Sequence, residues 1–521
     1  MLCLSPRVGS AWAVPRPRNP AVPRRVARRG LGSSGFVPRR ATPLASTLSR
    51  SSAAVDLDFR ATVPGWQVAG CLAAAAVGTG AVTWAWLGLS WATVASRPGP
   101  LILGLFGPRE RFILVALGAL VFAALVSALA EAQEQARLVP PRAIAAPDSR
   151  FARLGQHGLE VHYKSIELKT MKSFPPGHSP PAAAIAFMHG FGASLFDWTR
   201  DLSGDPAGCV LIRTATALDD AGTSALLMAY DSPGFGLTER TSDLRDYSVE
   251  RNGALASELL DFGLSDVGMA GTKRVLVGHS LGGLAAAQAL YESRVGDAEE
   301  GDADTAAAAT AEIDGLVLVS PAILPGAFHD GRRNVPRLVQ VLGAIIAGIL
   351  QSLASLTLAA LAPLGLLLLR ALVRNKKFWQ RGLASAFASP ASVTPALVDG
   401  YRGAKVVKGW DVGMWRFVRS RVTPLGPLGT IMAALQRLDR PRLMDVLLDR
   451  RRGVPILLVH GTDDAIIPVS NSRAIAEIAH AAGATLEYVE VPGTGHNLYL
   501  EQPEEFSRLL ASWVQRCVVN V

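Results

Sequence analysis

The residues best suited to chemistry lie at Gly278-His279-Ser280-Leu281-Gly282, a G-x-S-x-G sequence. An apolar run, Val275–Val277, precedes them, and a run of small residues, Leu284–Tyr291, follows. This order predicts a strand, a tight turn and a helix, which together would hold the Ser280 hydroxyl out at the carboxyl edge of a sheet. We expect Ser280 to be strained, and a Cβ at either glycine to collide with neighbouring backbone. Ser280 is therefore the candidate nucleophile, and the start of the helix adds positive potential for a developing anion.

A serine hydroxyl attacks poorly unless a base lies within hydrogen-bond reach. Of the nine histidines, His189, His279 and His460 fall in turns at predicted strand ends. His279 flanks Ser280 in a direction unsuited to bonding its hydroxyl. His496 lies in P-G-T-G-H-N after the last predicted strand, from where it could fold over the sheet edge. His496 is the candidate base.

The base in turn needs a carboxylate that orients the imidazole and stabilises its charged form. Asp463 and Asp464 follow a predicted strand in H-G-T-D-D-A-I-I-P. Because they are adjacent, their side chains point in different directions, and the residues alone leave both open.

Acyl transfer also needs two backbone N–H donors for the oxyanion. One is expected from Leu281, directly after the nucleophile. The other is expected from Phe191, in the H-G-F-G sequence that follows the predicted strand Ala183–Met188.

Further strands are predicted from short apolar or alternating runs. They are Leu159–Ile166, Leu226–Tyr230, Leu316–Val319, Ile456–Val459 and Thr485–Val491. Tyr247–Phe262 is predicted as a helix, whereas Thr214–Ser224 and Gly296–Glu312 are interpreted as solvated loops because of their low-complexity composition. Strands that alternate with helices predict an α/β fold, with a mostly parallel sheet and helices on both faces.

Five motifs occur in one order, each at a predicted strand end: H-G-F-G, D-S-P-G-F-G, G-H-S-L-G-G, G-T-D-D-A-I-I-P and G-T-G-H. Residues 150–320 and 450–518 thereby resemble the α/β-hydrolase superfamily. The resemblance implies Ser280 as nucleophile and His496 as base. The family pattern G-x-x-D-x-x-x-P matches Gly461, Asp464 and Pro468, and so favours Asp464 over Asp463 as the acid. The family also places a cap between the sixth and seventh strands.

The chain outside these motifs is basic at its start and apolar after it. Residues 1–55 hold ten arginines and no acidic residue, so the whole net charge of +9 comes from this segment and the rest of the chain is close to neutral. The net charge therefore gives no indication of nucleic-acid binding. This composition is typical of an organelle transit peptide, with a disordered basic tail as the alternative. The whole chain resembles plastid members of plants and algae that carry hydrophobic segments, which favours a chloroplast membrane over a mitochondrial one.

Two uncharged runs, Val63–Ser96 and Phe112–Ala130, are long enough to cross a bilayer, with a buried helical hairpin as the alternative. A third run, Leu338–Leu369, is interpreted as the apolar lining of the cap. A single crossing there would separate Ser280 from Asp464 and His496, and the run is too short for two crossings. It could also dip into one leaflet and admit lipid.

These observations divide the chain into residues 1–55 (transit peptide), 56–150 (membrane segment and linker), 151–320 (first part of the core), 321–450 (helical cap) and 451–521 (second part of the core). The predicted function is a membrane-associated serine hydrolase that cleaves an apolar, lipid-like ester. Hydrolysis of a thioester or a carbon–carbon bond, or a non-catalytic binding module, are the alternatives. The four cysteines form no disulfide framework. No metal or organic cofactor is expected, and the oligomeric state stays open.

Overall fold

A computed structural model describes most of the chain from Pro108 onward. The described ranges are residues 108–155, 157–168, 182–200, 208–265, 271–299, 312–323, 335–422, 432, 435, 443–449 and 453–520. The predicted transit peptide and the first hydrophobic run, Val63–Ser96, lie outside these ranges.

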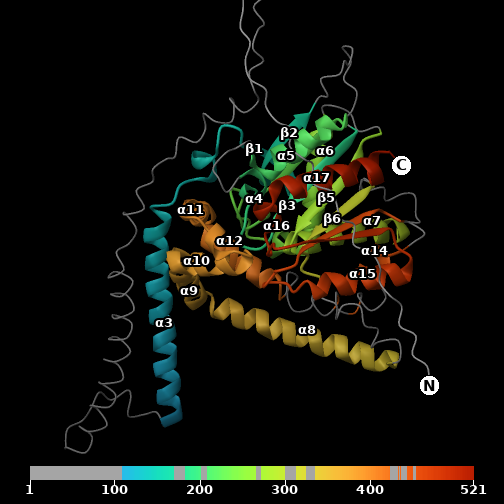
Figure 1. Cartoon of the computed structure of the whole chain (residues 1–521). Coiled ribbons are helices and arrows are strands. Elements are labelled where there is room, and N and C mark those ends of the chain that lie inside the picture. Colours follow the sequence, from blue (N-terminus) through green and yellow to red (C-terminus); the bar gives the residue numbers. More distant parts are fainter. Residues whose placement is uncertain are drawn as a thin grey trace, which may run out of the picture. The chain divides into compact units, whose positions relative to one another are not determined.

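One eight-stranded sheet organises the fold, in the order β1-β2-β4-β3-β5-β6-β7-β8 (Figure 1). The pairs β1–β2 and β2–β4 are antiparallel, and all the other pairs are parallel. The strands are β1 (Arg150–Leu154), β2 (Leu159–Leu168), β3 (Ala183–Met188), β4 (Ala225–Tyr230), β5 (Lys273–His279), β6 (Gly315–Val319), β7 (Ile456–Gly461) and β8 (Leu486–Val491). The mostly parallel sheet predicted from the sequence is confirmed.

Helices of the core connect these strands. They are α4 (Phe196–Thr199), α5 (Val210–Asp220), α6 (Val249–Leu264), α7 (Leu281–Glu299), α15 (Ser470–Ala482), α16 (Leu498–Glu501) and α17 (Pro503–Val514). Shorter turns of helix are η4 (Pro141–Ile144), η6 (Leu244–Tyr247), η8 (Pro390–Ser392), η9 (Ala404–Val406) and the π-helical η11 (Gln515–Val519).

Helix α5 corrects one prediction, because it occupies most of the stretch that we interpreted as a solvated loop, Thr214–Ser224. Its Thr214, Ala215 and Leu218 are buried. These three residues therefore form the packed face of a helix rather than part of a low-complexity insertion.

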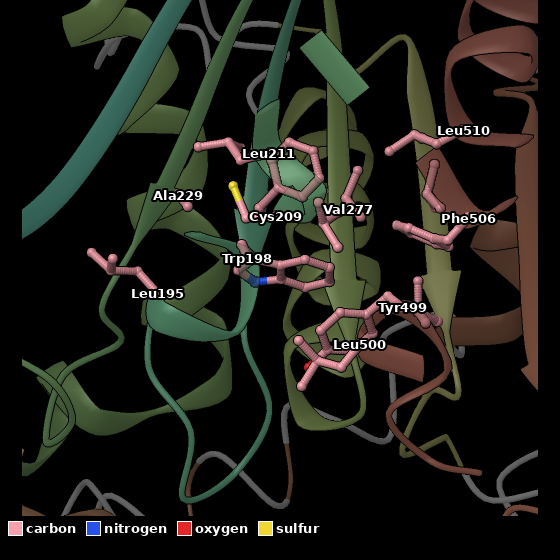
Figure 2. Packing of buried hydrophobic residues seen from close by; sticks show 14 of the residues in the cluster. Leu195, Trp198, Cys209, Leu211, Ala229, Val277, Tyr499, Leu500, Phe506 and Leu510 are labelled. Atoms are coloured by element: carbon pink, nitrogen blue, oxygen red, sulfur yellow. The ribbon is translucent and has the colours of Figure 1, made fainter. Parts of the chain in front are cut away.

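Alternate side chains of the central strands enter two separate apolar layers. Ile185 and Phe187 face the layer that contains residues of α5 and α17, and Ala184 and Ala186 face the layer that contains residues of α6 and α7. Figure 2 shows part of the first layer, where Trp198 lies against Tyr499 with ring centroids 4.3 Å apart. The sheet is thus covered by helices on both faces, and strand ends such as His279 are held rigidly.

The described part of the chain between β6 and β7 is mostly helical. Its helices are α8 (Arg337–Ala360), α9 (Ala362–Arg374), α10 (Lys376–Ala386), α11 (Pro395–Gly403), α12 (Trp410–Ser420) and α14 (Leu443–Leu447). Several of them pack on the core: the Ser420 hydroxyl donates to the Tyr247 carbonyl (3.1 Å), and the Tyr401 hydroxyl donates to Asp197 (3.0 Å).

Helix α8 differs from the apolar lining that we expected. Its only buried residues are Gly348 and Ser352, and leucines along its length are exposed, including Leu338 (70%) and Leu350 (60%). Among the described residues, α8 is the one helix that is long and apolar enough to cross a membrane by length and composition.

The second N-terminal hydrophobic run lies within one helix, α3 (Pro108–Gln135). The Ser127 hydroxyl donates to the carbonyl of Pro363 in α9 (3.1 Å), so α3 contacts the helices between β6 and β7. Leu117, Val121, Leu125 and Leu129 of α3 are more than half exposed.

Candidate active site

Ser280 stands between the end of β5 and the first residue of α7, with a backbone φ of +53°. A Cβ on Gly278 would lie 2.3 Å from the Gly282 carbonyl oxygen, and one on Gly282 would lie 2.4 Å from the Met188 oxygen. Both glycines are therefore required by close backbone contacts, as the sequence predicted. A positive φ at a non-glycine residue is costly and persists only where the surroundings enforce it.

Two backbone hydrogen bonds enforce this turn, one to the last residue of β6 and one from the loop that follows β6. The Ser280 amide donates to the Val319 carbonyl, and the Ala322 amide donates to the Ser280 carbonyl, each at 2.9 Å. Ser320, at the end of β6, is itself at a positive φ of +42°. This second strained serine could not be predicted from the sequence, because no glycine pattern surrounds it.

His496 and Asp464 form a hydrogen-bonded pair, with His496 Nδ1 2.8 Å from Asp464 Oδ2. Both residues are buried. Asp464 Oδ1 accepts from the amides of Ile466 (2.8 Å) and Ile467 (2.9 Å), so both carboxylate oxygens are held. The pair joins the loop after β7 to the loop after β8, two segments that the sequence predicted to meet at the sheet edge.

His460, at the end of β7, is a further partner of Asp464, with Nε2 3.1 Å from Oδ2. Burial by itself would raise the pKa of Asp464, but hydrogen bonds from His460 and His496 outweigh it and hold the pKa well below its usual range. The carboxylate is thus ionised at neutral pH. Asp463 is exposed and its Oδ1 accepts from the Thr462 hydroxyl (3.1 Å), so it is not part of this cluster.

His279 contacts His496 from the other side. Its Nε2 donates to the His496 carbonyl (3.0 Å), and the two ring centroids lie 4.6 Å apart. Burial lowers the pKa of His279 well below its usual value, which keeps the ring neutral. The residue beside the nucleophile therefore anchors the loop that carries His496, a contact that sequence reasoning missed.

The anchor continues into the core through Tyr499. Its hydroxyl lies 3.3 Å from His279 Nδ1 and donates to Asp197 Oδ2 at 2.9 Å. Its ring stacks on Trp198 (Figure 2). A buried polar chain thus runs from Asp197 through Tyr499 and His279 to the backbone of His496.

The H-G-F-G loop passes directly beside the elbow. A Cβ on Gly190 would lie 3.1 Å from Ser280 Cβ and 3.0 Å from His279 Nδ1. His189 fixes the loop, because its Nδ1 donates to the Gly190 carbonyl (2.8 Å) and its Nε2 accepts from the Ser232 amide (3.0 Å). The backbone of this loop is therefore placed close to Ser280.

The two residues expected to supply oxyanion donors flank the elbow. Leu281 is the first residue of α7, and Phe191 follows Gly190 in the loop. The Phe191 ring is 57% exposed and contacts Phe235 and Phe417, with centroids 5.8 and 5.7 Å away. Within the described ranges, no group of three or more His, Cys, Asp or Glu side chains is arranged to hold a metal ion.

Asp231, the first residue of the D-S-P-G-F-G motif, has a structural role. Its carboxylate accepts from the amides of Leu195 (2.8 Å) and Leu237 (2.7 Å) and contacts His162 Nδ1 (2.6 Å). Burial opposes ionisation, yet these partners lower the pKa of Asp231 to about 2. It ties the loop after β3 to the loop after β4.

Comparisons with known proteins agree with this architecture. Residues 185–509 match the sequence model of the alpha/beta hydrolase family. A curated protein of Mycoplasma pneumoniae, named "Putative esterase/lipase 1", is 29% identical over 90 residues. That match covers 17% of this chain and 32% of the relative, so the chain spans about a third of the curated protein it matches.

Solved structures of similar fold include an esterase from Thermogutta terrifontis, at 16% identity and a TM-score of 0.40, covering 71% of this chain and 99% of that one. A bacterial membrane phospholipase A has 19% identity and a TM-score of 0.40, covering 81% and 99%. The family model covers well over half of the sequence and spans the elbow, Asp464 and His496. The chain therefore belongs to the alpha/beta hydrolase family.

Proposed function

We propose that this protein is a serine hydrolase that cleaves a carboxylic ester through an acyl-enzyme. The observation that carries the proposal is the buried His496–Asp464 pair, 2.8 Å apart, anchored through His279 to the strained elbow of Ser280. Family membership alone does not fix a reaction, because one fold hosts many chemistries.

In the proposed mechanism, Ser280 Oγ attacks the ester carbonyl carbon while His496 Nε2 accepts its proton. Asp464 accepts a hydrogen bond from His496 Nδ1, which fixes the tautomer and stabilises the imidazolium, and it stays ionised throughout. The amides of Phe191 and Leu281 hold the oxyanion. His496 then gives its proton to the leaving alcohol, which leaves the acyl group bonded to Ser280 Oγ. In the second half, water attacks the acyl-enzyme while His496 accepts its proton, and His496 returns that proton to Ser280 Oγ as the carboxylic acid leaves.

The first test is Ser280→Ala, measured as hydrolysis of a p-nitrophenyl ester. We expect turnover to fall by at least about 10³-fold, because the nucleophile is lost. The melting temperature should not fall, since the substitution removes one small hydroxyl from a half-buried side chain. Unchanged hydrolysis would contradict the assignment. The two alternative chemistries of the same triad are tested with other substrates. Hydrolysis of a labile thioester would indicate thioester cleavage, and hydrolysis of a β-diketone would indicate cleavage of a carbon–carbon bond.

We further propose that the protein acts at a membrane on an apolar ester. Support comes from α8, whose large apolar side chains are exposed along its length. Helix α9 follows immediately and has only 13 residues, about 20 Å, which is too short to return across a bilayer of about 30 Å. If α8 crossed the bilayer, the chain after it would stay on the side opposite Ser280, and the proposed site could not form. We therefore propose that α8 lies in one leaflet and does not cross the membrane.

Two further features support the membrane proposal. Lys376 and Lys377 are exposed just after α9, where they suit anionic headgroups. The arginine-rich, acid-free composition of residues 1–55 supports delivery to a chloroplast membrane, with a mitochondrial membrane as the alternative. A fluorescent protein fused behind residues 1–55 would report which organelle imports it.

A further inference from the structure

A pocket with an excess of positive charge lies between the core and the helices that follow β6. From the core it is lined by residues of the loops after β3 and β4, and from the other side by residues of α11, η9 and α12. It contains about 570 Å³ of space not filled by atoms, part of it open to solvent. Neither Ser280 nor His496 lines it.

Three cationic side chains line this pocket: Arg200, Arg240 and Lys405. Arg200 donates to the Ala396 carbonyl (3.0 Å), and Lys405 Nζ donates to the Tyr401 carbonyl (3.0 Å). Arg240 donates to the carbonyls of Thr238 and Gly236, while its Nε is buried with no hydrogen-bond partner. Within the described ranges, none of the three forms a salt bridge.

The carboxylates nearby are already engaged. Asp197, the acid that lines the pocket, accepts from the hydroxyls of Tyr401 and Tyr499. Asp231 attracts Arg240, but its oxygens are taken by His162 and two backbone amides. Burial lowers the pKa of Lys405 to about 6. Even with Lys405 neutral and Asp197 ionised, the two arginines leave the lining with a net positive charge.

The three cationic side chains are partly exposed to solvent, so an anion can reach them. A guanidinium has five N–H donors, and those of Arg200 and Arg240 are not all used by the carbonyl contacts above. Apolar side chains form the rest of the wall, among them Phe235, Leu397 and Met414. We propose that this pocket binds an amphiphile through its anionic end, a phosphate or a carboxylate, with the apolar part lying against these side chains.

The site adjoins the proposed oxyanion loop, because Gly192, which follows Phe191, also lines the pocket. A bound anion would therefore contact the same loop that faces Ser280. The proposal rests on the pocket residues alone, and it stands whether or not Ser280 is the nucleophile.

The test uses the full-length protein in nonionic detergent and isothermal titration with three probes: hexyl phosphate, inorganic phosphate and hexanol. The variants are Lys405→Met and Arg200→Gln, each checked by its melting temperature. Lys408→Met is the matched control, because Lys408 is exposed only three residues away and does not line the pocket. The titrations are run at about pH 5, where the Lys405 side chain is mostly charged. Losing one charged hydrogen-bond donor is then expected to weaken hexyl phosphate binding by at least about 10-fold.

We expect one hexyl phosphate per chain, weaker binding in both pocket variants and unchanged binding in Lys408→Met. Inorganic phosphate should bind at least about 10-fold more weakly than hexyl phosphate, and hexanol should not bind measurably. Folded pocket variants that bind hexyl phosphate as the unaltered protein does would overturn the site. Equal affinity for hexyl phosphate and inorganic phosphate would overturn the proposal that the ligand is an amphiphile, and would show that the pocket binds a free anion instead.

Discussion

At the scale of single residues, the two adjacent aspartates after β7 make the sharpest contrast. Asp464 is buried and bonded to His496, whereas Asp463 is exposed and bonded to its neighbour Thr462. Asp464→Asn should reduce kcat on the order of 10³–10⁴-fold, because the amide leaves His496 in the wrong tautomer. Asp463→Asn, the matched control, should stay within about 3-fold of the unaltered enzyme. Steady-state ester hydrolysis compares them, and the opposite ranking would transfer the role to Asp463.

Asp197 carries a pH dependence of stability. Burial raises its pKa to about 7, although Tyr499 and Tyr401 donate hydrogen bonds to it. Between the ordinary pKa of an aspartate and about 7, the folded state holds a proton that the unfolded state has lost. Stability therefore falls as pH rises through this window and levels off above it.

Asp197→Asn removes this titration. The variant should melt higher than the unaltered protein at pH 8, and the difference should shrink by pH 5, where both side chains are uncharged in the folded state. Burying the charge costs about 1.4 kcal/mol per pKa unit, so a penalty on the order of 2–4 kcal/mol is expected at pH 8. Thermal melts of both proteins at the two pH values measure it. A difference independent of pH would show that Asp197 does not titrate in this range.

At the scale of elements, seven of the eight strands could be predicted, because their apolar or alternating runs are short and most end at turn residues. Strand β1 (Arg150–Leu154) was not predicted. Helix α5 was missed because its alanines and threonines resemble a linker in composition, although Thr214, Ala215 and Leu218 share one buried face. The exposure of α8 could not be deduced either. An apolar helix that lines a cavity and one that faces lipid have the same kind of sequence. Only the tertiary contacts distinguish these two positions.

The proposed membrane contact of α8 can be tested by placing charges on its exposed leucines. Leu350→Glu combined with Leu353→Glu places two charges on side chains that are 60% and 55% exposed. Binding to vesicles that contain anionic lipid should weaken by at least about 10-fold in sedimentation, because each charge opposes burial in the leaflet.

Phe262→Glu is the control for the α8 variant. Phe262 is also an apolar residue with an exposed side chain (43%), but it lies on α6, outside the segment proposed to contact the membrane. Vesicle binding should be unchanged in this variant. If the α8 variant sediments with vesicles as fully as the control, α8 is not a membrane contact.

At the scale of the whole molecule, the candidate site is assembled from segments far apart in the chain. Ser280, Asp464 and His496 could be selected from the sequence because each lies in a short motif at a strand end. The chain Asp197–Tyr499–His279 behind them could not, because it joins three residues more than 80 positions apart that share no motif. The same is true of the cationic pocket, whose Arg200, Arg240 and Lys405 come together only through packing.

The central claim is that Ser280 is a nucleophile activated by His496 and Asp464. A fluorophosphonate probe, incubated with the full-length protein in detergent and followed by peptide mass mapping, tests it most directly. We expect one covalent adduct on Ser280, absent in Ser280→Ala and formed at least about 100-fold more slowly in His496→Gln. No adduct on the folded protein, or an adduct that forms equally fast in His496→Gln, would contradict it.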